Sequence, residues 1–251
     1  MNSHMTLAPG NLRIVQLGID GRAVLSEELV AAIAAACDDL EDGTLPAVLR
    51  LHIRGGKDAG EAWPGDVNVS VLHHWEKVLH RIERLQGVTV AVASGACGGA
   101  ALELLLAADH RIAVPAFWLS IMSSEGASWP SMAMYRMVRR HGPSAARKLW
   151  MFTTRLQATD ALELGVVDEI ASNAQQSADE FITALAKFDV SALAARRLLI
   201  AESTLGSYED RIGAHLAACD LELRRRRALS ASLGEPCGVP PPQGMHHASV
   251  A

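Results

Sequence analysis

One short stretch of the chain combines a glycine-rich bend with a single carboxylate, residue types that could stabilise negative charge and move protons. Residues 88–93 are apolar and mostly β-branched, which predicts a buried strand. Residues 95–99 include three glycines, where the backbone can turn sharply. Residues 100–108 are apolar apart from Glu103 and favour a helix, whose free N–H groups would bind an anion. Taken alone, the stretch also fits a tight turn in which Glu103 is solvated.

The segments around this stretch alternate strands with helices, as in a parallel sheet with crossover helices. Ser26 is a good N-cap for the first helix, and Gly43 and Pro46 end it. Further helices are expected at 67–85, 100–108, 128–140, 143–152, 158–164, 173–188, 191–203 and 208–227, and strands at 12–17, 47–53, 88–93, 110–114 and 166–170.

Length and composition indicate one large domain, or a domain plus a small appendage, with a sizeable core. The chain has 251 residues, 49% of them hydrophobic, and a net charge of −5, which argues against a nucleic-acid partner. No apolar run reaches membrane-spanning length and no signal peptide is evident. The cysteines do not form metal-type pairs, so we expect reduced thiols and a cytoplasmic location; they are Cys37, Cys97, Cys219 and Cys237.

The chain divides into four regions by composition. Residues 1–5 look like a cloning scar, and residues 6–172 form an α/β core. Residues 173–233 are a helical region without strands, and residues 234–251 are rich in Gly, Pro, Ser and His, which predicts a disordered tail. No metal site is expected, because the histidines of residues 73–80 lack further ligands in reach.

Several of these segments resemble the enoyl-CoA hydratase/isomerase (crotonase) family. The resemblance covers residues 12–222 and implies a crotonase-like α/β spiral of ββα units with a C-terminal helical trimerisation region, hence a homotrimer or a dimer of trimers. It rests on Gly95, Gly99-Ala100-Ala101-Leu102-Glu103, Asp109, Gly126, Arg136, Arg139, Gly142 and Ala158-Thr159-Asp160-Ala161-Leu162-Glu163-Leu164-Gly165-Val166-Val167-Asp168.

The resemblance also implies roles for individual residues. Glu103 would be the catalytic acid or base, and the backbone N–H groups of Trp63 and Ala100 would form the oxyanion hole. The family's first oxyanion segment, A-G-x-D, reads Trp63-Pro64-Gly65-Asp66 here, so the loop is altered and Trp63 could instead fill a hydrophobic gap. Substrate binding is expected at four positions, which are Gly65, Gly99, Met122 and Gly126.

The second glutamate of the family's hydratases is missing from this chain. Met122 or Ile121 stands at its position, depending on the anchor used for the alignment, and Glu125 lies one turn late. Hydration of a double bond normally uses two carboxylates, whereas dehydration or a proton shift can proceed with one. Glu103 is therefore expected to work alone unless Glu125 substitutes.

The chemistry that fits is loss of water or a proton shift on an acyl-CoA thioester through an enolate, with CoA as substrate carrier and no bound cofactor. The altered loop and the missing glutamate are most similar to the small crotonases that assist 3,5-dihydroxyphenylacetyl-CoA synthesis in antibiotic pathways, which implies a partner type III polyketide synthase. Alternatives are a catalytically degenerate crotonase that binds and stimulates such a partner, a hydrolase using Ser123 or Ser124, and a nucleophilic Cys97.

Overall fold

A computed structural model describes residues 3–8, 11–43, 46–56, 63–121, 123–124, 127–153, 155–203 and 206–233. It contains two compact units, Met1–Ala201 and Glu202–Ala251. The first unit holds the main sheet and its covering helices, and the second holds helix α8 (Tyr208–Leu233).

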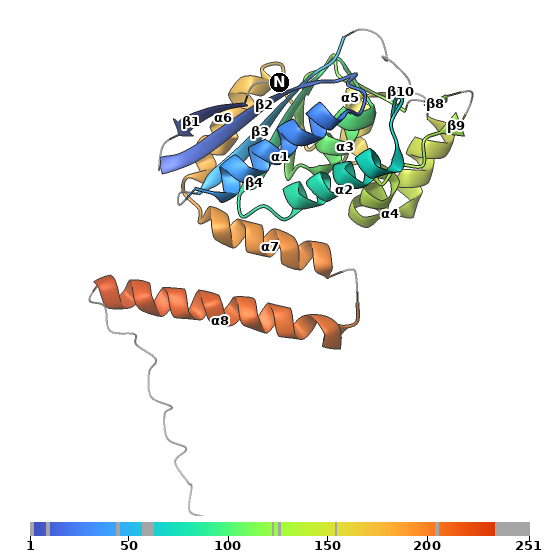
Figure 1. The fold of residues 1–251 in the computed structure, drawn as a ribbon. Coiled ribbons are helices and arrows are strands. Elements are labelled where there is room, and N and C mark those ends of the chain that lie inside the picture. The colour runs from blue at the N-terminus through green and yellow to red at the C-terminus, as the bar shows by residue number, and fades with distance from the viewer. Residues whose placement is uncertain are drawn as a thin grey trace, which may run out of the picture. The chain divides into compact units, whose positions relative to one another are not determined.

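The core of the first unit is a six-stranded sheet with the order β1-β2-β3-β4-β6-β11. Figure 1 labels the first four strands of this sheet. Neighbouring strands from β2 onward are parallel, and β1 pairs antiparallel with β2. The strand β1 was not predicted, and it includes residues of the segment interpreted as a cloning scar. The strands are β1 (Ser3–Ala8), β2 (Leu12–Asp20), β3 (Ala47–Arg54), β4 (Val88–Ser94), β6 (His110–Ala113) and β11 (Glu169–Ile170).

Both faces of this sheet are covered, which explains why β3 and β4 are buried at nearly every position. One face packs in a large core with α1 (Glu27–Glu41), α2 (Val69–Glu83) and α3 (Gly99–Ala107). The other face packs against α6 (Ala174–Leu185) in a second core. The predicted helix–strand alternation is confirmed, with most boundaries shifted by a few residues.

The helices that surround the glycine-rich bend are held in place by caps and cross-links. Ser26 caps α1 as predicted, since its hydroxyl accepts a hydrogen bond from the N–H of Leu29. At the end of α3, Arg140 donates to the carbonyl of Ala108 at 2.9 Å, which satisfies a free acceptor there. Arg140 lies on α4 (Ala133–Phe152), so this contact ties α4 to α3.

The expected helix at 128–140 begins later than predicted. Ser128 belongs to a short strand, β9 (Ala127–Ser128), which pairs with β8 (Ser123–Ser124). The following helix α4 has a break at Gly142, whose φ of 83° favours glycine. The break confirms the predicted change of helix before Pro143.

The remaining elements are short or C-terminal. A small sheet with the order β10-β7-β5 includes two residues of the glycine-rich bend as β5 (Ala96–Cys97), together with β7 (Trp118–Ser120) and β10 (Arg155–Gln157). The other helices are α5 (Ala158–Glu163) and α7 (Val190–Glu202). Within the described ranges, no helix is long and apolar enough to cross a membrane, and no cluster of three or more His, Cys, Asp or Glu residues could hold a metal ion.

Helix α2 begins at an N-cap whose loss can be measured. The side chain of Asn68 accepts a hydrogen bond from the N–H of Val71 at 3.1 Å. We expect Asn68→Ala to lower the free energy of unfolding by about 1 kcal/mol. Asn68→Ser should keep most of the wild-type stability, because serine is also a good N-cap. Urea unfolding of the three proteins measures this; equal stabilities would show that the cap contributes nothing.

Candidate active site

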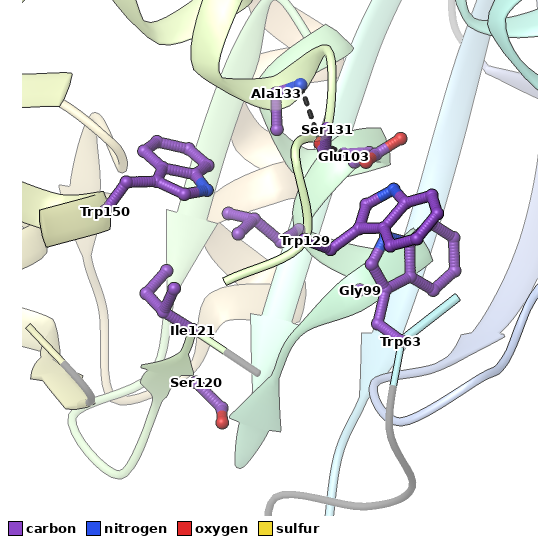
Figure 2. A pocket seen from close by; sticks show the side chains of 10 residues that line it. Trp63, Gly99, Glu103, Ser120, Ile121, Trp129, Ser131, Ala133 and Trp150 are labelled. Atoms are coloured by element: carbon purple, nitrogen blue, oxygen red, sulfur yellow. Dashed lines mark hydrogen bonds between the residues drawn. The ribbon is translucent and has the colours of Figure 1, made fainter. Parts of the chain in front are cut away.

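A small cavity lies beside the first turn of α3, with Glu103 in its wall (Figure 2). Its volume is about 20 Å³, which is room for about one water molecule. Three indole side chains and several small or apolar residues surround it, so most of the wall is apolar. The lining residues are Trp63, Gly99, Leu102, Glu103, Ser120, Ile121, Trp129, Ser131, Ala133 and Trp150.

Glu103 is the charged residue of this wall, and it is almost fully buried. Its exposed fraction is 2%, because all residues of α3 are buried between the neighbouring elements. The expectation of a solvated Glu103 in a simple turn is therefore wrong. A carboxylate in such a place requires hydrogen-bond donors.

Two donors from different parts of the chain hold the two carboxylate oxygens. The indole N–H of Trp75, on α2, donates to Oε2 at 2.6 Å. The hydroxyl of Ser131, just before α4, donates to Oε1. Ser131 in turn accepts a hydrogen bond from the N–H of Ala133 at 2.8 Å (Figure 2). The carboxylate is thus fixed in orientation by contacts from two elements.

The surroundings raise the pKa of Glu103 above that of an ordinary glutamate. Burial is the largest cause, since it disfavours the charged form, and the negative charge of Glu76 acts in the same direction. The hydrogen bonds from Ser131 and Trp75 and the charge of Arg136 oppose it. A carboxyl group with a raised pKa can both accept and donate a proton near neutral pH.

Arg136 links the helices on either side of the cavity. Its guanidinium is buried and pairs with Glu76 at 2.8 Å and with Glu83 at 3.2 Å, both on α2. From the sequence, Arg136 was notable only as one of the residues that carry the resemblance to the crotonase family. The structure instead places Arg136 as a cross-link between α4 and α2, the two regions that supply the donors to Glu103.

The start of α3, where main-chain N–H groups have no acceptor within the helix, lies at the same cavity. Gly99 lines the cavity, and Ala100 is the second residue of the helix, where N–H groups have no acceptor within the helix. Gly99 has a φ of 49°, and a Cβ there would lie 2.7 Å from the Trp63 ring. Glycine is therefore required at this position by both backbone conformation and close packing.

Trp63 lies next to this helix start through its side chain. Its indole is buried, lies against Gly99, and makes an edge contact with Trp75 at a centroid distance of 6.3 Å. Its ring N–H is buried without a hydrogen-bond partner. The structure thus brings Trp63 beside the Gly99–Ala100 turn. The alternative interpretation, in which the indole fills an apolar gap, also fits these contacts. Gly65 has a φ of 89° and packs near Val24, and it is not one of the described residues that line the cavity.

Other predicted site residues fall in different places. Met122, Gly126 and Glu125 lie outside the described residues, while Ile121 lines the cavity. Among the described residues, Glu103 is the one carboxylate in the cavity wall. Cys97 is fully buried, and burial raises the pKa of its thiol far above the ordinary value, which argues against a nucleophile.

Sequence reasoning missed the partners of Glu103. Trp75 lies within the helix expected at 67–85, where no role was assigned to it, and it is buried on α2. Ser131 carried no motif, and Trp129 and Trp150 line the cavity from positions far along the chain. The need of a buried carboxylate for hydrogen-bond donors could have signalled that such partners exist. The spacing of residues along the sequence does not say which side chains supply these donors.

The raised pKa of Glu103 predicts a pH-dependent stability difference. A carboxyl group whose folded pKa exceeds its unfolded value stabilises the fold below the unfolded pKa, and this contribution is lost as the pH rises through the folded pKa. We therefore expect Glu103→Gln to gain stability relative to the wild type as the pH rises from the ordinary pKa of a glutamate to the raised pKa of Glu103, by about 1.4 kcal/mol per unit of the pKa difference. Urea unfolding at several pH values measures this.

The exposed Glu163 on α5 supplies a matched control. Glu163→Gln should follow the pH dependence of the wild type. Parallel stability curves for wild type and Glu103→Gln would contradict a raised pKa.

Comparisons with known proteins agree with this geometry. The model of the enoyl-CoA hydratase/isomerase family matches residues 56–208. An enoyl-CoA-hydratase of Amycolatopsis orientalis is 38% identical over 209 residues, which are 83% of this chain and 95% of that protein. The enoyl-CoA isomerase/hydratase fer4 of Mycosarcoma maydis is 31% identical over 147 residues, 52% of this chain and 51% of that protein.

Solved structures extend the likeness to the whole fold. The crystal structure of an enoyl-CoA hydratase from Shewanella pealeana has a TM-score of 0.75 at 18% identity, covering 92% of this chain and 93% of that chain. An enoyl-CoA hydratase from Mycobacterium smegmatis has a TM-score of 0.75 at 16% identity, covering 92% and 94%. Together with the sequence matches, these place the chain in the enoyl-CoA hydratase/isomerase family, with its crotonase-like α/β fold.

Proposed function

We propose that this protein is an enzyme that removes water from, or shifts a double bond in, an acyl-CoA thioester, with Glu103 as its single proton-transfer group. The thioester carbonyl oxygen would accept hydrogen bonds from the backbone N–H groups of Trp63 and Ala100. Two such donors stabilise the negative charge of an enolate, and each is typically worth about 3–4 kcal/mol in the barrier.

The observation that carries this proposal is the buried Glu103 in the wall of a cavity, one turn from a helix start. A carboxylate that is 2% exposed and bonded to Trp75 and Ser131 is costly to keep in an apolar wall. Such a cost is typical of functional sites, where a shifted pKa serves proton transfer. Family membership supplies the substrate class, CoA thioesters, with no metal cofactor.

In the proposed dehydration, the carboxylate of Glu103 takes the α-proton of a 3-hydroxyacyl thioester, and the C–H electron pair forms the enolate. The enolate electrons then form the α–β double bond as the β-hydroxyl leaves. The leaving hydroxyl takes the proton from Glu103, so water is released and the carboxylate is restored. In the proposed double-bond shift, Glu103 returns the same proton to another carbon of the acyl group.

We further propose that this reaction belongs to polyketide or antibiotic precursor biosynthesis in the cytoplasm, where the protein would act alongside a partner type III polyketide synthase. The substituted Trp63-Pro64 loop and the single described carboxylate of the cavity support it. Substrate contacts are proposed at Gly65, Gly99, Met122 and Gly126, and the chain is proposed to act as a homotrimer or a dimer of trimers through its C-terminal helices.

A second candidate is a crotonase without chemistry of its own that binds and stimulates a partner synthase. The observation that favours it is the size of the cavity, about 20 Å³ between three indoles, which leaves little space for an acyl group. In this case the buried Glu103 would take no part in proton transfer.

The role of Glu103 is tested by Glu103→Gln with a panel of 3-hydroxyacyl-CoA and enoyl-CoA thioesters. We expect the variant to lose a factor of about 10²–10⁴ in kcat, the usual contribution of a general acid–base group, while circular dichroism shows an unchanged fold. Unchanged turnover would remove Glu103 from the mechanism.

The two candidates differ in their effect on a partner. If wild type and Glu103→Gln both lack turnover and stimulate a co-purified type III synthase equally, the binding role is the better account. If the wild type stimulates product formation by the synthase and Glu103→Gln does not, the catalytic role of Glu103 is the better account.

A further inference from the structure

We propose that Ser131 is a positioning residue for Glu103, one that fixes the orientation of the carboxyl group and, together with Trp75, determines which of its oxygens carries the proton. This inference rests on the proposed role of Glu103 in proton transfer. It begins from the geometry of the two donors, which differ in what they can do.

Trp75 offers only a donor. Its indole N–H bonds Oε2 of Glu103 at 2.6 Å, and an indole N–H cannot accept a hydrogen bond in return. Oε2 must therefore remain an acceptor in both protonation states of Glu103. When Glu103 takes up a proton, the proton is directed to the other oxygen, Oε1.

Ser131 can follow Glu103 through this change. Its hydroxyl donates to Oε1 of Glu103 and accepts from the N–H of Ala133 at 2.8 Å. A hydroxyl oxygen has two lone pairs, so one stays available after the bond from Ala133. When Glu103 is ionised Ser131 donates to Oε1, and when Oε1 carries the proton Ser131 can accept from it.

The two donors also differ in position. Ser131 belongs to the wall of the cavity beside Glu103, whereas Trp75 lies behind that wall and is 1% exposed. The proton is therefore held on the oxygen next to Ser131, at the cavity. A proton on Oε2 would instead face the Trp75 ring and could not be delivered to a substrate.

Ser131 also adjusts how readily Glu103 ionises. The charged groups that face Glu103 are Glu76 on α2, which raises its pKa, and Arg136 on α4, which lowers it. The hydrogen bond from Ser131 favours the ionised form. Without this hydrogen bond, only Trp75 and Arg136 would oppose the increase in the pKa of Glu103 that burial causes. The carboxylate needed as a base would then form at a higher pH.

The test compares Ser131→Ala with Ser131→Thr, which keeps the hydroxyl, and with Ser120→Ala, which removes a hydroxyl elsewhere in the cavity wall. The pKa of Glu103 is measured in substrate-free protein by ¹³C NMR of its carboxyl carbon, assigned with Glu103→Gln. The pH dependence of kcat is measured with the same proteins, and circular dichroism checks the fold.

We expect Ser131→Ala to raise the measured pKa of Glu103 by about one pH unit, the size of one hydrogen bond to a charged group. The acid limb of kcat should move by the same amount with KM little changed. Ser131→Thr should restore both values, and Ser120→Ala should leave the NMR pKa as in the wild type.

Two outcomes separate this inference from the proposed function. If Ser131→Ala leaves the NMR titration of Glu103 unchanged, the positioning role is overturned whatever the activity. If the NMR pKa rises but the acid limb of kcat does not move, the contact stands and Glu103 is not the proton-transfer group of the reaction.

Discussion

The arrangement of this site depends on a carboxylate that is kept in an apolar wall by two hydrogen bonds. Burying an ionised carboxylate without partners costs many kcal/mol, so Glu103 can be retained only where donors meet it. Trp75 and Ser131 supply them from α2 and from the start of α4. Arg136 joins the same two helices through Glu76 and Glu83, which holds the donors in register with the acceptor.

The fold provides the place where these elements converge. Helix α3 leaves the end of β4 through a glycine-rich bend and is buried along its whole length, so its side chains face neighbours on every side. Such a helix is expected to be apolar on all sides, and α3 is apolar except for Glu103. The carboxylate of Glu103 lies in the wall of the cavity. The contact of Gly99 with the Trp63 ring shows why the bend needs a residue without a side chain.

Much of the scaffold could be predicted from local patterns, because strands and helices are dictated by hydrophobic periodicity and caps. Ser26 and the change of helix before Pro143 are examples that the structure confirms. Glu103 could be singled out from its position after the glycines. Its partners could not, because Trp75 precedes it by 28 residues and Ser131 follows it by 28, and such contacts arise only from the packing of helices. The strand β1 was missed because its first residues, 3–5, were interpreted as part of a cloning scar and left out of the fold.

The central claim is that Glu103 moves the α-proton of a thioester, and it can be measured without knowing the natural acyl group. Short acyl-CoA thioesters are incubated with the protein in D₂O, and deuterium at the α-carbon is followed by NMR. The account predicts exchange with the wild type and its loss with Glu103→Gln. No exchange with any thioester, or equal exchange in the two proteins, would contradict it.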